Sequence, residues 1–189
     1  MSENQPQWMR LLCKETVDTD TVRKFASQYW FLWNRIERDD NQPLVYEWST
    51  AQQDCRIRYT DDHRLGQRWF ELQGPGVQQA AILVKSAFPI YQREDVIALA
   101  SEAKDENHAI WAAFRLAVWV YGLPFDPDMF GAFGDLANHR STRARDAAIY
   151  AMGQTGWPQF AGILEPMAED DPDEGVRMRA KMALGALPK

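Results

Sequence analysis

The side chains that most often do chemistry in proteins are few in this sequence and lie far apart. His63, His108 and His139 fall in three separate turn-like segments, and none has a second His or a Cys at metal-ligand spacing. Cys13 and Cys55 do not form a Cys-x-x-Cys motif. No nucleophile motif, phosphate-binding glycine loop or dinucleotide fingerprint occurs. The sequence therefore predicts no catalytic residue, no metal ligand and no cofactor site.

Two weaker chemical interpretations stay open beside that prediction. Asp61, Asp62 and His63 bring together two carboxylates and an imidazole, a set that a metal ion or a proton relay could use. Aspartates at a hairpin turn more commonly accept hydrogen bonds from the turn's own backbone, and we favour a solvated turn. Cys13 and Cys55 are interpreted as small buried apolar residues, with chromophore attachment or a redox role as the alternative.

The composition limits the class of protein and its compartment. The chain has 189 residues and 46% hydrophobic content, which is enough to fill a core. Its net charge is −6, which is the wrong sign for a protein that neutralises phosphates. The N-terminus lacks a signal-peptide pattern. The longest apolar stretch, Ala109 to Leu123, contains Arg115 and is shorter than the ~20 residues that span a bilayer. We expect a cytoplasmic protein without a membrane partner.

The first 89 residues mix helical and strand patterns, which predicts a small α+β region. Apolar residues at the spacing of one helix face run from Asp18 to Arg38, and a shorter helix is expected from Gln7 to Lys14. Between Leu44 and Gln73 apolar and polar residues alternate, as in a three-stranded antiparallel meander. A third helix is expected from Val77 to Phe88, where the next residue is a proline.

Residues 90–189 carry no strand pattern and repeat instead. An offset of 32 residues aligns two segments of this half so that four pairs of positions carry the same residue. These pairs are Arg145 and Arg177, Ala148 and Ala180, Ala151 and Ala183, and Gly153 and Gly185. An offset of 34 in the other direction gives a weaker match, with bulky residues in place of small ones, as in an adapting terminal repeat.

The repeats predict three helical hairpins. Their helices are expected at 93–104 with 107–121, 128–138 with 141–155, and 158–168 with 173–187. The segments between them are polar and rich in turn formers, and prolines lie at or near helix starts, where a missing N–H has no cost. Gly156 is expected to end the second hairpin before Trp157 and Pro158 open the third.

The segment DDPDEGVRMRAKMALGAL, from Asp170 to Leu187, resembles the second helix of HEAT-type repeats, especially the short HEAT-like repeats of phycobilisome lyases. Their pattern is Asp-Pro, then Val-Arg, then Ala and Ala-Leu-Gly. RSTRARDAAIYAMGQTG, from Arg140 to Gly156, matches it less fully. The resemblance covers about the last hundred residues. It implies a mainly α fold, in which an α-solenoid of about three HEAT-like hairpins over 90–189 follows the α+β cap of 1–89.

The same resemblance gives the arginines of the repeats a structural role. The Val-Arg arginine of HEAT-type repeats usually braces a neighbouring repeat through an acidic side chain. Arg145 and Arg177 occupy this position, and the acidic candidates are Asp135, Asp146 and the run from Glu169 to Asp171. Anion binding by these arginines is the alternative interpretation.

A geometric argument indicates a binding groove. The last helix buries Val176 and the Ala and Leu residues one and two turns later, so Met178 and Met182 face the opposite way. In HEAT-type stacks the second helices line the concave side. The repeat offsets bring aromatic, methionine and other apolar residues into one groove there: Leu116, Trp119, Tyr150, Met178 and Met182. The alternative is that the N-terminal half fills this groove and completes the core.

The sequence thus favours a non-enzymatic scaffold or adaptor that binds a protein or peptide on the concave repeat face. The alternative is a lyase-like or accessory protein that binds a cofactor or chromophore, an idea that the eight tryptophans support and the missing acid, base and metal set opposes. Nucleic-acid binding through Arg140, Arg143, Arg177 and Arg179 is disfavoured, because residues 90–189 hold ten basic and fifteen acidic side chains.

Overall fold

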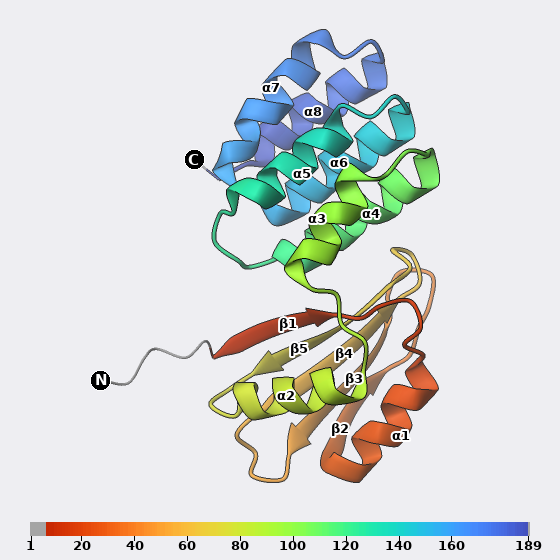
Figure 1. The fold of residues 1–189 in the computed structure, drawn as a ribbon, viewed down its shortest axis with the longest axis vertical. Helices are drawn as coiled ribbons and strands as arrows, with labels where there is room; N and C mark the ends of the chain where they lie inside the picture. The colour runs from red at the N-terminus through yellow and green to blue at the C-terminus, as the bar shows by residue number, and fades with distance from the viewer. Residues whose placement is uncertain (1–6, 189) are drawn as a thin grey trace, which may run out of the picture. The chain divides into compact units, whose positions relative to one another are not determined.

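The computed structural model describes residues 7–188 and divides the chain into two compact units, residues 1–91 and 92–189 (Figure 1). Unit 1 combines one antiparallel sheet with two helices, and unit 2 is helical. No helix in the described part of the chain has both the length and the apolar character needed to cross a membrane.

The sheet of unit 1 has five antiparallel strands in the order β1-β5-β4-β3-β2. The strands are β1 (Trp8–Leu12), β2 (Trp30–Ile36), β3 (Leu44–Thr50), β4 (Arg56–Asp62) and β5 (Gln67–Gln73). Helices α1 (Thr19–Tyr29) and α2 (Val77–Ala87) cover one face of the sheet (Figure 1). That face and the two helices form one buried apolar core, which includes Val22, Trp48, Tyr59, Phe70 and Val84.

The expected meander between Leu44 and Gln73 is present as β3, β4 and β5, but the sheet has five strands rather than three, because both outer strands fall in segments expected to be helical. The expected helix from Gln7 to Lys14 is β1, whose residues pair with β5 from Trp8 opposite Gln73 to Leu12 opposite Trp69. The expected helix from Asp18 to Arg38 ends at Tyr29, and Trp30 is already extended, with φ −133° and ψ 153°. Large aromatic residues suit a strand as well as a helix, and pairing with β3 decides between them.

The opposite face of the sheet carries a row of polar side chains, one from each strand, of which the four on β1, β5, β4 and β3 alternate in charge. Arg10 pairs with Glu71, Arg58 Nε lies 3.8 Å from Glu71 Oε2 and Arg58 Nη1 lies 3.6 Å from Glu47 Oε1. Asn34 Nδ2 completes the row by donating to Glu47 Oε2 at 2.8 Å. Each of these pairs consists of residues directly opposite each other in neighbouring strands, so the side-chain pairs match the backbone register of the sheet.

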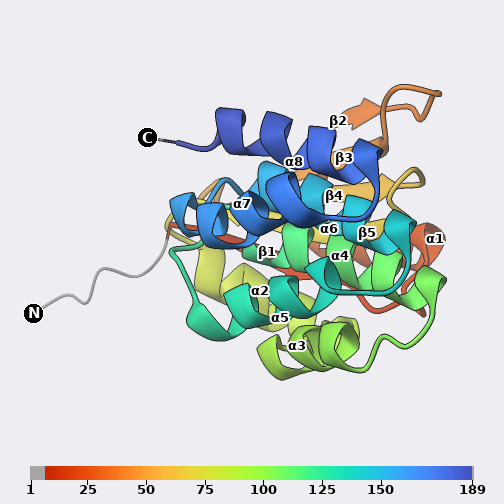
Figure 2. The ribbon, with the colours of Figure 1, turned by 90° about the horizontal axis from the view of Figure 1, so that it is seen from above.

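Unit 2 consists of three helical hairpins, and over its described residues, 92–188, it contains no strand, as predicted. The helices are α3 (Arg93–Ser101), α4 (Glu106–Val120), α5 (Pro127–Ala137), α6 (Thr142–Thr155), α7 (Ala161–Asp170) and α8 (Glu174–Ala186), with a short 3-10 turn, η1 (Pro158–Phe160), before α7. Helix α6 packs between α4 and α8 in one layer, and α5 lies between α3 and α7 in the other (Figure 2).

The second helix of every hairpin begins at a capping side chain. Asp105 accepts a hydrogen bond from the backbone N–H of His108, Ser141 from Ala144, and Asp173 from Val176, at 3.0 to 3.4 Å. These caps fix where α4, α6 and α8 start. Gly156 ends α6 in the left-handed conformation, with φ 71°, which confirms that one hairpin ends there and the next begins.

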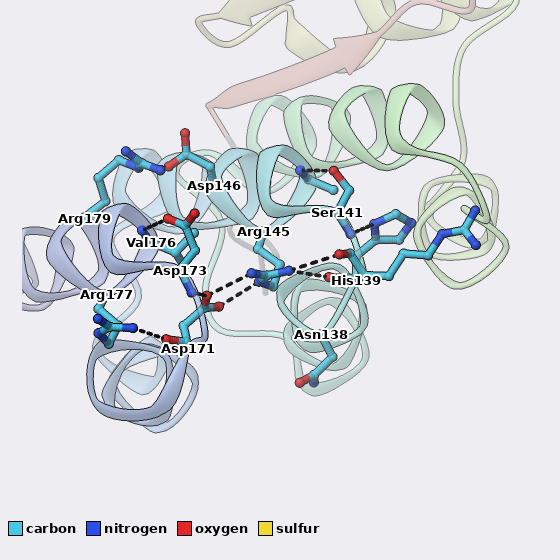
Figure 3. Close-up of polar contacts among 12 residues, drawn as sticks. Asn138, His139, Ser141, Arg145, Asp146, Asp171, Asp173, Val176, Arg177 and Arg179 are labelled. Atoms are coloured by element: carbon cyan, nitrogen blue, oxygen red, sulfur yellow. Dashed lines mark hydrogen bonds and ion pairs between the residues drawn. The ribbon is translucent and has the colours of Figure 1, made fainter.

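A buried ion pair joins the second hairpin to the third (Figure 3). Arg145 Nε and Nη2 donate to the two carboxylate oxygens of Asp171 at 2.7 and 2.8 Å, and both residues are only 8% exposed. Arg145 Nη1 also donates to the carbonyl oxygens of His139 and Arg140, at 3.1 and 3.3 Å. One guanidinium therefore links the turn between α5 and α6 to the turn between α7 and α8.

The expected bracing role is confirmed for Arg145 and is wrong in its details for Arg177. Arg177 Nη1 donates to the backbone carbonyl of Asp171 at 2.5 Å, and both residues belong to the same hairpin. The Asp171 carboxylate instead accepts from Arg145 and from the backbone N–H of Asp173, the latter at 2.9 Å. Arg177 thus stabilises the turn of its own hairpin, whereas Arg145 connects two hairpins.

The burial of this pair predicts a large loss of stability in Asp171→Asn. The variant leaves the Arg145 guanidinium buried without a counter-charge, which should lower the free energy of unfolding by about 3–5 kcal/mol. Asp146→Asn is the matched control, because its ion pair with Arg179 is about 40% exposed and such a pair contributes about 0–1 kcal/mol. Urea unfolding of both variants measures the difference, and equal losses would contradict the assignment.

The ion pair between Arg145 and Asp171 should also make the free energy of unfolding depend on pH in acidic solution. The hydrogen bonds from Arg145 lower the pKa of Asp171, so the stabilisation is complete above the ordinary aspartate pKa of about 3.9 and is lost as the pH falls through the lowered value. Asp171→Asn has no such titration. The difference in free energy of unfolding between wild type and variant should therefore shrink below about pH 4. Urea titrations over a pH series test this, and a constant difference would refute it.

Candidate functional site

Leu116, one of the five residues predicted to line a groove, lies in the core. Its side chain is completely buried, so the prediction that it lines a surface is wrong. The physical reason is that α4 contacts three helices, α3, α5 and α6, and is therefore buried over a wide arc that includes Ala109, Ala112, Ala113, Leu116 and Val120. Helix α8 contacts fewer helices than α4. Positions that are exposed on α8 therefore do not predict which positions are exposed on α4.

Tyr150, Met178 and Met182 are exposed, at 52%, 57% and 69%. They lie on α6 and α8, two helices that pack against each other. An ion pair between Asp146 and Arg179 joins the two helices, and Tyr150 and Met182 each lie about one turn beyond it. We call the surface formed by Tyr150, Met178 and Met182 the α6–α8 face.

The α6–α8 face has a fixed support. The Tyr150 ring meets the Phe114 ring of α4 edge to face, with ring centres 6.0 Å apart and an angle of 88°. At the start of the same helices, Glu106 accepts hydrogen bonds from Ser141 Oγ at 2.6 Å and from Arg143 Nη1 at 2.8 Å. The starts of α4 and α6 are therefore held together, and α6 carries Tyr150.

Trp119 lies in a different place from the three exposed residues. It lines a pocket of about 460 Å³ that also includes Leu123, Phe125, Asp126 and Trp157. The pocket is built by the end of α4, the turn that follows it and the start of η1. Trp157 Nε1 donates to the carbonyl oxygen of Leu123 at 3.0 Å, which holds the indole against this turn.

The charged groups of this pocket are already occupied by one another. Arg93 donates to both oxygens of Asp126 at 2.8 and 2.9 Å and to Asp128 at 2.6 Å. The hydrogen bonds that Arg93 donates lower the pKa of Asp126, and the same bonds, accepted by the Asp126 and Asp128 carboxylates, raise the pKa of Arg93. The pocket therefore offers aromatic walls and a fixed charge cluster, but no carboxyl group poised to donate a proton.

The other chemical candidates have structural roles. Asp62 accepts hydrogen bonds from the backbone N–H groups of Arg64 and Leu65, at 3.0 and 3.3 Å, as expected for a turn. The expectation that Asp62 lies in a solvated turn is wrong, because Asp62 is only 3% exposed at the end of β4. Asp61 is buried and pairs with Arg38 and Arg68, at 2.9 and 3.2 Å. Burial raises the pKa of Cys13 to about 12, which keeps the thiol protonated. No group of three or more metal-ligating side chains occurs within residues 7–188.

Sequence reasoning missed Phe125 and Trp157 as pocket residues. Both come from turns, where helical periodicity carries no information. The one signal in the sequence is their proximity to prolines, since Phe125 lies between Pro124 and Pro127 and Trp157 precedes Pro158. Prolines stiffen turns, and a stiff turn can hold an aromatic side chain in place.

Comparison with known proteins agrees with this architecture. Residues 93–185 match the family described as HEAT repeats, a range that runs from the first residue of α3 almost to the end of α8. No curated protein and no solved structure matches the chain. The N-terminal unit has no family match. The C-terminal half of this chain is therefore a HEAT-repeat segment, built from the three hairpins of unit 2.

Proposed function

We propose that unit 2 is a non-enzymatic scaffold or adaptor module that binds a protein or peptide on the α6–α8 face. HEAT repeats generally mediate interactions between proteins, which is compatible with this role. The observation that carries the proposal is the exposure of Tyr150, Met178 and Met182 on two adjacent, braced helices. Tyrosine supplies contact area with a polar end, and methionine adapts its shape to a partner.

The partner in this proposal is an apolar segment of another protein. Two ion pairs beside the α6–α8 face neutralise four of its neighbouring charges, because Asp146 pairs with Arg179 and Arg143 pairs with Glu106, and Lys181 remains as an exposed cation next to Met182. A surface with compensated charge and bare apolar side chains gains affinity chiefly by burying area. Long-range steering of a highly charged ligand such as duplex DNA needs an uncompensated positive patch instead.

Two exposed glycines permit close approach of a partner. Gly153 on α6 and Gly185 on α8 are equivalent in the 32-residue repeat, and a Cβ added at either would meet no atom within 4 Å. Glycine within a helix costs about 0.5–1 kcal/mol relative to alanine. Contacts inside the unit do not require these glycines, and the same holds for Gly131 on α5 and Gly162 on α7, so the two glycines are compatible with close approach of a partner backbone but do not single out this face.

The second candidate function, binding of a cofactor or chromophore, is favoured by the pocket at Trp119. Its aromatic walls, formed by Trp119, Phe125 and Trp157, suit a flat apolar molecule. Visible absorbance of the purified protein would support this candidate.

The cytoplasm is the proposed location for either function, and the two free, buried cysteines are compatible with a reducing compartment.

The proposal predicts that Tyr150→Ala and Met182→Ala weaken partner binding with little loss of stability. Both side chains are more than half exposed, so truncation opens no core cavity. Met182→Ala should change the free energy of unfolding by about 0.5 kcal/mol or less, and Tyr150→Ala, which also loses the ring contact with Phe114, should lower it by about 0.5–1.5 kcal/mol. Loss of a central anchor costs about 2 kcal/mol or more of binding free energy. The matched control is Ile82→Ala on α2, because Ile82 has the same 69% exposure as Met182.

The measurement compares the immobilised wild type and the three variants in capture from a cell extract, with thermal melts of each. A protein retained by wild type and Ile82→Ala, and lost from Tyr150→Ala and Met182→Ala, supports the α6–α8 face. Retention by all four proteins would place the interface elsewhere. A large drop in melting temperature in both variants would show that these side chains serve the fold.

A further inference from the structure

The outer strand β2 leaves an unusual amount of apolar surface exposed. It is an edge strand, paired with β3 on one side only, so half of its backbone N–H and C=O groups point away from the sheet. Three consecutive large side chains on it are bare: Phe31 at 65%, Leu32 at 55% and Trp33 at 57%. Edge strands usually carry charges or prolines that prevent pairing with another chain. The first half of β2 carries neither, and its one irregularity is a register shift against β3 at Trp33, between Leu32 and Asn34.

A pocket lies beside this edge, within unit 1. It measures about 390 Å³ and is lined by Arg23, Lys24, Ser27, Trp30, Phe31, Leu32, Tyr46 and Trp48. Its aromatic residues form a continuous floor, since the Tyr46 and Trp48 rings stack with centres 5.4 Å apart and the Trp30 and Trp48 ring centres are 6.0 Å apart. The floor suits an apolar or aromatic side chain.

The rim of this pocket is basic. Arg23 and Lys24 come from the exposed side of α1, which runs into β2 without a linker and so holds both cations next to the edge. Asp20 pairs with Arg23 at 3.1 Å in a largely exposed contact. Lys24 has no ion-pair partner among residues 7–188, and no carboxylate lines the pocket. This charge favours an acidic ligand.

From these three features we propose that β2 binds an extended acidic peptide segment of another protein. The segment adds to the sheet as a sixth strand on the free edge of β2, places an aromatic side chain in the pocket beside Trp30, and sets its carboxylates against Arg23 and Lys24. Main-chain hydrogen bonds supply affinity in this mode of recognition, and alternate side chains supply specificity. The site belongs to unit 1 and does not depend on the function proposed for unit 2.

Charge and shape favour an acidic peptide at this edge over a second copy of the chain and over a free aromatic anion. A second copy of the chain would bring its own Arg23 and Lys24 to the edge, next to cations of the same sign. A free aromatic anion would fill the pocket and leave Trp33 and the edge backbone of β2 uncovered, because Trp33 does not line the pocket. An acidic strand covers all of these groups at once.

The test uses a synthetic peptide, acetyl-Glu-Val-Phe-Val-Asp-amide, with the full-length protein. In an extended peptide the Glu, Phe and Asp side chains fall on one side and the two Val side chains on the other. Isothermal titration calorimetry should detect binding of this peptide. The peptide with Lys in place of both acidic residues should bind at least about tenfold more weakly.

Backbone methylation separates strand addition from side-chain binding. One peptide carries N-methyl groups on the two Val residues, and another carries them on Glu, Phe and Asp, so each blocks the N–H groups of one edge. An added strand faces β2 with a single edge. One methylated peptide should therefore bind about tenfold or more weakly, through two or more lost hydrogen bonds, while the other binds as before. Equal affinities for both would overturn the proposed strand addition.

Variants locate the site on the protein. The double variant Arg23→Glu with Lys24→Glu should weaken binding at least about tenfold, while Lys85→Glu, an exposed change on α2, should leave it unchanged. Failure of the peptide to bind, or equal binding by both variants, would refute the proposal. A dimer in sedimentation velocity that Leu32→Lys dissociates would assign the edge to a second copy and would also refute it.

Discussion

The buried ion pair between Arg145 and Asp171 is the contact on which the arrangement of the last two hairpins depends. Removing two charges from water costs several kcal/mol for each ion, and the cost is offset only where every polar group finds a partner. Arg145 meets this condition by donating to one carboxylate and two carbonyl oxygens. Since those acceptors lie in two different turns, the pair cannot form until both hairpins are in place.

Weaker contacts repeat this pattern at the other turns of unit 2. Glu106 at the start of α4 holds Ser141 and Arg143 at the start of α6, and the Trp157 indole holds the turn after α4 through the Leu123 carbonyl. Both ends of the stacked helices are therefore tied across repeats. Between these tied ends, the Tyr150 side chain of α6 is 52% exposed and its ring meets the Phe114 ring of α4 edge to face.

The helical repeats could be predicted from the sequence because their information is local. Each boundary has its own signal, as at Gly156, where a left-handed residue ends α6, and at Asp173, whose side chain caps α8. The alternating pattern from Leu44 to Gln73 likewise predicted β3, β4 and β5, whereas the outer strands β1 and β2 could not be predicted in this way. Trp30 to Ile36 has an apolar spacing that also fits a helix, and only β3, eight or more residues further on, makes it a strand. The pocket at Trp119 was missed because three separate segments build it.

The row of charges across the sheet has a consequence for how the strands of unit 1 find their register. A shift of β1, β3, β4 or β5 by one residue would turn its charged member toward the core, where Tyr46, Ile57 and Phe70 are buried. A shift of β1 by two residues would keep the faces but place Arg10 opposite Trp69 or Gln73 and so separate it from Glu71. The native register is therefore favoured because it keeps the charged side chains out of the core and, for β1, because it keeps the ion pair between Arg10 and Glu71.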